Sequence, residues 1–104
     1  MAVYFLNAPS VGRIKIGTAI YPEERILAIR LISPVPVELI GSIKGGYKEE
    51  KELHNKFSSL RRHGEWFESS NELTKFIEFK LLLSAWEAAR PEARDEFLKE
   101  IGER

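Results

Sequence analysis

The chain has 104 residues, 16 basic and 16 acidic side chains, and no cysteine. Its length is that of one domain with a modest core. The lack of cysteine excludes a disulfide framework, a thiolate nucleophile and a cysteine-type zinc site. The longest apolar run, at residues 81–83, is far too short to span a membrane. No signal-peptide pattern opens the chain, so we expect a cytoplasmic protein that does not enter the membrane.

The zero net charge is unevenly distributed along the chain. Residues 1–67 carry ten Lys or Arg against seven Asp or Glu, whereas residues 68–104 carry six against nine. Such an asymmetry permits one half of the molecule to face a polyanion while the other is a solvated acidic surface.

Two β-rich runs open the chain, at residues 3–6 and 13–16. The segment 7–12 between them is rich in turn-forming residues, which predicts a β-hairpin. Side chains alternate along a strand, so Tyr4 and Lys15 each face away from their immediate neighbours.

The later elements follow from periodicity and from helix breakers. Pro22 suits the first turn of a helix that runs to about residue 31. We predict five further elements. They are a strand over 37–43, a helix over 47–60, a short return strand or tight packing segment over 64–67, an apolar helix over 73–86 and a final amphipathic helix that begins at Pro91. The expected fold is α/β (α+β), a small three-stranded antiparallel sheet flanked by helices, with a helical C-terminal extension.

Four short motifs occur in order along the first two thirds of the chain. They are Val3-Tyr4, Lys15-Ile16-Gly17, an E-x-x-L-H-x-x-F run over residues 50–57, and Gly64-Glu65-Trp66-Phe67. Together with Arg25, they resemble the GIY-YIG nuclease superfamily, in a phage-associated branch that has KIG in place of YIG and ends in GEWF.

This resemblance departs from the family pattern in three ways. Ala2 stands where the family name expects glycine, and Lys15 stands where the second tyrosine would be. Nothing at the end of the core resembles the asparagine found in many relatives. The resemblance implies a catalytic core over residues 1–68, with residues 69–104 as a helical extension packed on the same domain.

The resemblance also implies roles for individual residues in phosphodiester hydrolysis. Tyr4 would activate the attacking water, and because the ordinary pKa of a tyrosine is about 10, it needs positive charge nearby. Glu50 would be the protein ligand of one Mg²⁺ or Mn²⁺ ion. Arg25 and Lys15 would bind the phosphate. The structural alternatives are a packed strand tyrosine and a solvated helix glutamate, with Glu49 as the next choice for the metal ligand.

Further polar residues complete the expected site. His54 follows Glu50 by four residues, so both share a helix face, and His54 is a general acid, an orienting group or simply a boundary histidine. Arg13, Arg61 and Arg62 are candidates for contact with nucleic acid. The last two also suit a helix C-terminus, where positive charge favours the helix dipole.

The expected function is a Mg²⁺-dependent DNA endonuclease or nickase, with DNA as the partner. A non-catalytic DNA-binding module on the same scaffold is one alternative, which the zero net charge favours. A protein-interaction domain is another, because the apolar residues of helix 73–86 cover more than one helical face. The same helix predicts a homodimer across a two-fold axis.

Overall fold

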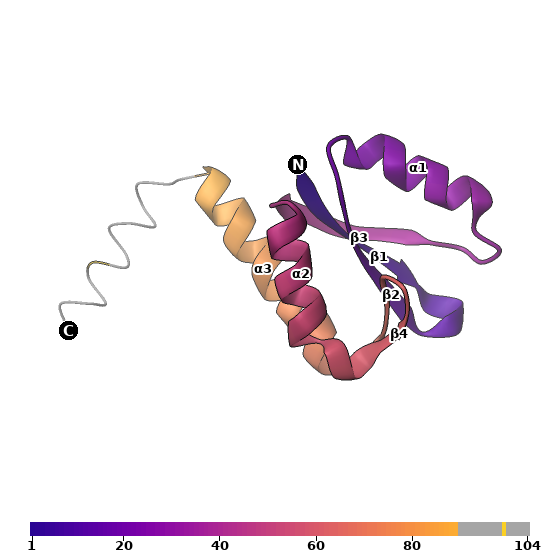
Figure 1. The fold of residues 1–104 in the computed structure, drawn as a ribbon. Helices are drawn as coiled ribbons and strands as arrows, with labels where there is room; N and C mark the ends of the chain where they lie inside the picture. The colour runs from indigo at the N-terminus through magenta and orange to yellow at the C-terminus, as the bar shows by residue number, and fades with distance from the viewer. Residues whose placement is uncertain (90–98, 100–104) are drawn as a thin grey trace.

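The computed structural model describes residues 1–89 and residue 99 (Figure 1). It has the expected α+β class, with a five-stranded antiparallel sheet in the order β3-β1-β2-β5-β4. The strands are β1 (Ala2–Ala8), β2 (Arg13–Ala19), β3 (Glu38–Lys44), β4 (Arg61–His63) and β5 (Trp66–Glu68). The α-helices of this part of the chain are α1 (Pro22–Ile32), α2 (Tyr47–Lys56) and α3 (Asn71–Ala89).

The prediction of a three-stranded sheet is wrong, because β4 and β5 form an additional hairpin that pairs with β2. Each of these strands has three residues, too few for an alternating pattern to be recognised. Gly64 turns the chain between them at φ 57°, a backbone conformation that favours glycine. The helix predicted over 47–60 ends at Lys56 and is followed by a 3-10 turn.

The sheet carries α2 and α3 on one face and α1 on the other (Figure 1). Val3 and Phe5 of β1 are buried against residues of α2 and α3. Tyr4 and Leu6, which alternate with them, are buried with Ile26 of α1. The alternation predicted for the first strand is therefore confirmed, and Tyr4 belongs to the face that α1 covers.

Helix α3 packs by one side, where Leu73 and Ile77 are completely buried. Phe79 and Leu82 point away from the core and are 60% and 72% exposed. No helix in residues 1–89 is both long and apolar enough to cross a bilayer. The final helix predicted from Pro91 lies outside the described residues, and the homodimer through residues 73–86 stays a prediction.

Candidate functional site

The second strand of the sheet is only partly covered along its outer edge. β5 pairs with Arg13, Ile14 and Lys15, and the amide of Ile16 donates to the carbonyl of Glu65 at 3.0 Å. In the described part of the chain, residues 17–19 pair only with β1. A pocket of about 570 Å³ lies beside this end of β2.

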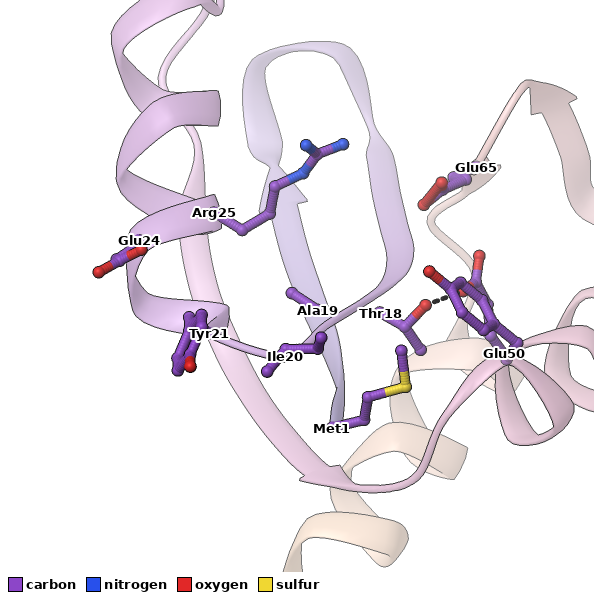
Figure 2. A pocket seen from close by; sticks show the side chains of 10 residues that line it. Met1, Thr18, Ala19, Ile20, Tyr21, Glu24, Arg25, Glu50 and Glu65 are labelled. Carbon is purple, nitrogen blue, oxygen red and sulfur yellow. Dashed lines mark hydrogen bonds between the residues drawn. The ribbon is translucent and has the colours of Figure 1, made fainter.

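Charged and polar side chains from different elements reach this pocket. They are Arg25 from α1, Glu50 from α2, Glu65 from the turn before β5 and Thr18 from β2. Figure 2 shows the Arg25 side chain extending from α1 toward the part of the pocket where Glu50 and Glu65 lie. Residues from both faces of the sheet therefore meet at the free edge of β2.

Glu50 is held by neighbours on two elements. The Thr18 hydroxyl donates a hydrogen bond to its carboxylate (Figure 2). His54, one helical turn later, places Nε2 3.6 Å from Glu50 Oε1, which confirms that the two residues share a helix face. Both side chains are 13% exposed, so the carboxylate is fixed in position yet still reaches the pocket.

His54 connects α2 to the sheet. Its Nε2 lies 2.9 Å from the carbonyl oxygen of Ile16, and because a carbonyl only accepts, this nitrogen carries the hydrogen. The ring also packs against Phe67, with 5.1 Å between centroids. These contacts favour the orienting role over the general-acid role, because the Nε2 hydrogen is already donated to the backbone.

Tyr4 lies directly opposite Gly17 in the pairing of β1 with β2. Its side chain is buried, with 1% exposed. A Cβ atom on Gly17 would lie 2.5 Å from the Tyr4 hydroxyl oxygen and 2.7 Å from Glu65 Oε2. The missing side chain at residue 17 therefore lets the phenol and the carboxylate approach the same point above β2.

Replacing Gly17 with alanine should destabilise the protein by about 1–3 kcal/mol, the usual cost of overpacking a well-filled site. The new methyl group would also lie 2.6 Å from Tyr4 Cζ, so a buried ring and not only a flexible chain end must move. Urea unfolding of the wild-type and variant proteins measures the difference. An unchanged unfolding midpoint would contradict this tight packing.

The pKa of Tyr4 is raised above its ordinary value of 10.0. Burial of the ring is the largest cause, because it disfavours the charged phenolate. A hydrogen bond with Arg25 acts in the opposite direction, and the carboxylates of Glu65 and Glu50 raise the pKa further. The expected positive charge is therefore present at Tyr4, yet the phenol keeps its proton.

This raised pKa predicts a loss of stability at alkaline pH. Below pH 10 the Tyr4 phenol is neutral in both the folded and the unfolded chain, so its contribution to the free energy of unfolding is intact. Above that pH the unfolded chain releases the proton first, and this contribution is lost as the pH rises through the folded-state pKa. Tyr4→Phe should lose less stability between about pH 9 and 11 than the wild type, as measured by urea unfolding at each pH.

The exposed Tyr21 provides the matched control for the alkaline experiment, since its side chain is 69% exposed. Tyr21→Phe should follow the wild-type dependence of unfolding free energy on pH. Identical curves for Tyr4→Phe and the wild type would contradict the raised pKa.

Lys15 lies on the same face of the sheet as Tyr4, but beside Trp66 and not in the main pocket. Its Nζ is 3.3 Å from Glu65 Oε2 and 5.7 Å from the centroid of the Trp66 ring. Lys15 and Arg25 both line a second pocket of about 330 Å³. Arg25 therefore belongs to both pockets, and Glu65 links Lys15 to the first one.

Three of the basic residues predicted to contact nucleic acid have local partners and do not line the main pocket. Arg13 donates to the carbonyl of Gly12 at 3.2 Å, and Arg61 donates to that of Gly64 at 2.7 Å. Arg62 forms an ion pair with Glu68. These contacts favour structural roles for the three arginines within the hairpins.

The carboxylates of the pocket are candidate ligands for a magnesium ion. Within residues 1–89, no three His, Asp or Glu side chains are grouped so as to hold a metal ion. Mg²⁺ in phosphoryl-transfer sites is instead held by one or two carboxylates, with waters and substrate phosphates as its other ligands. Glu50, fixed by Thr18 beside an open pocket, fits such a site.

The pocket also contains residues to which the sequence assigned no role, among them Thr18 and Glu65. Thr18 directly follows the Lys15-Ile16-Gly17 motif, and strand alternation places it on the face that α2 covers. Glu65 stands within the Gly64-Glu65-Trp66-Phe67 motif, where a charged residue between glycine and two aromatic residues was the available signal.

No curated protein and no solved structure matches the chain. The sequence profile of the T5orf172 domain matches residues 1–81, which include all five strands, α1, α2 and the polar residues of the pocket. The chain therefore belongs to the T5orf172 domain family, a phage-associated family.

Proposed function

We propose that this protein is a Mg²⁺-dependent DNA endonuclease or nickase of the GIY-YIG type. One observation carries the proposal: Arg25 and Glu50, which come from helices on opposite faces of the sheet, line a single pocket at the free edge of β2. The hydroxyl of Tyr4 lies next to this edge, against Gly17. A cationic fork, a carboxylate and a nearby phenol can supply the phosphate binding, the metal ligand and the activated water that phosphodiester hydrolysis needs.

Each residue has a role that its surroundings support. Arg25 binds a non-bridging phosphate oxygen with its planar set of donors, and Lys15 binds phosphate from the adjoining pocket. Glu50 would hold Mg²⁺ or Mn²⁺, which supplies charge neutralisation and Lewis-acid polarisation when it is bound. Tyr4 activates the attacking water.

The charge of the pocket supports a requirement for a divalent cation. Glu50 and Glu65 contribute carboxylates beside the guanidinium of Arg25, and Glu24 lines the same pocket as a third glutamate. A phosphate that entered next to two carboxylates would be repelled by each of them. A divalent cation between phosphate and carboxylate removes this repulsion.

Cleavage of supercoiled plasmid tests the proposal. With Mg²⁺ we expect conversion to the nicked form, and an excess of chelator should prevent it. Binding of the plasmid without cleavage would instead support the non-catalytic DNA-binding module. A lack of affinity for DNA at low salt would support a protein-interaction domain, for which Phe79 and Leu82 on α3 provide exposed apolar side chains.

A further inference from the structure

Glu65 lines the pocket although the sequence assigned it no role. Its carboxylate oxygen Oε2 lies 3.3 Å from Lys15 Nζ, and its side chain is 36% exposed. It lines the same pocket as Arg25 and Glu50. Glu65 is therefore an accessible carboxylate that an ion pair holds in a defined position.

The Glu65 carboxylate lies close to the Tyr4 hydroxyl. Tyr4 Oη and Glu65 Oε2 are 2.5 and 2.7 Å, respectively, from the point that a Cβ atom on Gly17 would occupy. Two oxygens this near to one point are close enough for a single water molecule to bridge them. A proton can therefore pass between the phenol and the carboxylate.

A buried phenol that keeps its proton cannot act alone as a base. It can accept a proton from water only if its own proton leaves at the same time, which requires an acceptor beside it. Glu65 provides this acceptor, and its exposed part lets the proton pass on to solvent.

We propose that Glu65 is the acceptor that receives, through the Tyr4 hydroxyl, the proton released by the attacking water. This inference rests on the proposed nuclease function. As the oxygen of the water bonds to phosphorus, one of its protons moves to Tyr4 and the phenol proton moves to Glu65. The bond from phosphorus to the leaving sugar oxygen breaks, and that oxygen takes a proton from a solvent water. The proton that Glu65 later releases to solvent neutralises the hydroxide left behind. Tyr4 remains neutral throughout, and Glu65 ends the step as a carboxylic acid.

Of the other glutamates that line the pocket, Glu50 is less suited to this role. Glu50 accepts a hydrogen bond from Thr18 and comes from α2, on the opposite face of the sheet from Tyr4. Glu65 reaches the Tyr4 side of β2 and pairs there with Lys15. The geometry therefore assigns metal binding to Glu50 and proton acceptance to Glu65.

Glu65→Gln is the test, with Glu68→Gln as the matched control. Glu68 belongs to the same hairpin, is 45% exposed and pairs with Arg62 away from the pocket. Plasmid nicking at saturating Mg²⁺ should fall by about 10²–10⁴-fold in Glu65→Gln, as for the loss of a general base, and should stay unchanged in Glu68→Gln. DNA affinity of Glu65→Gln should be equal or higher, because a negative charge has left the pocket.

The split between rate and affinity separates a catalytic role from a structural one. Equal losses of nicking and DNA affinity, or faster nicking in Glu65→Gln, would overturn the inference. Glu65→Asp keeps the carboxylate and should nick faster than Glu65→Gln; equal rates would count against proton acceptance. Suppose that the wild type nicks plasmid, that Glu50→Gln does not nick it, and that Glu65→Gln nicks it at the wild-type rate. The role of Glu65 is then wrong, while the proposed nuclease function stands. A wild-type protein that does not nick under any of these conditions overturns the proposed function and this inference together.

Discussion

Replacing Glu50 with glutamine should reduce Mg²⁺-dependent nicking by on the order of 10³-fold or more, the loss expected when a preorganised electrostatic group is removed from a reaction site. The amide has nearly the same shape and keeps an oxygen that can accept the hydrogen bond from Thr18. The fold should therefore be preserved, while the negative charge that holds the cation is lost. Nicking is measured on supercoiled plasmid, and thermal unfolding confirms that the variant is folded.

Two neighbours on α2 serve as controls for this variant. Glu52 is exposed and does not line the main pocket, so Glu52→Gln should nick at the wild-type rate. Glu49, the other glutamate considered as a metal ligand, accepts a hydrogen bond from the amide of Gly46 at 2.7 Å, and this bond lowers its pKa. Glu49→Gln should also keep its activity. Full activity in Glu50→Gln, or its loss in Glu49→Gln, would contradict the assignment.

Local patterns in the sequence were sufficient for the first half of the fold. The turn-rich segment between two β-rich runs predicted the hairpin of β1 and β2, and the period of two placed Tyr4 and Leu6 on one face. The spacing of four placed Glu50 and His54 together on α2. Such features depend on neighbours in sequence, so periodicity detects them.

Long-range contacts account for what the sequence did not reveal. Glu65 reaches Tyr4 and Lys15 only because β5 docks on β2, about fifty residues away in the chain. The three-residue strands of that hairpin carry no recognisable period. Arg61 and Arg62 form a basic pair in the sequence, yet their partners in the same hairpin occupy them. Charge alone therefore does not reveal which arginine faces a ligand.

Replacing Tyr4 with phenylalanine should lower nicking by about 10²–10⁴-fold, the range for a lost acid–base group. The ring remains to fill the buried site between β1 and α1, so the fold should persist. DNA affinity should change little, because the phenol is almost completely buried. Single-turnover nicking and plasmid binding measure the two effects separately.

Tyr21 offers the matched control, because it also lines the pocket but is exposed. Tyr21→Phe should nick at nearly the wild-type rate, whereas full activity in Tyr4→Phe would remove Tyr4 from the mechanism. The double variant that combines Tyr4→Phe with Glu65→Gln shows whether the two residues act on the same proton. If both residues handle the same proton, the second substitution adds little to the first. Two independent roles would instead multiply the two losses.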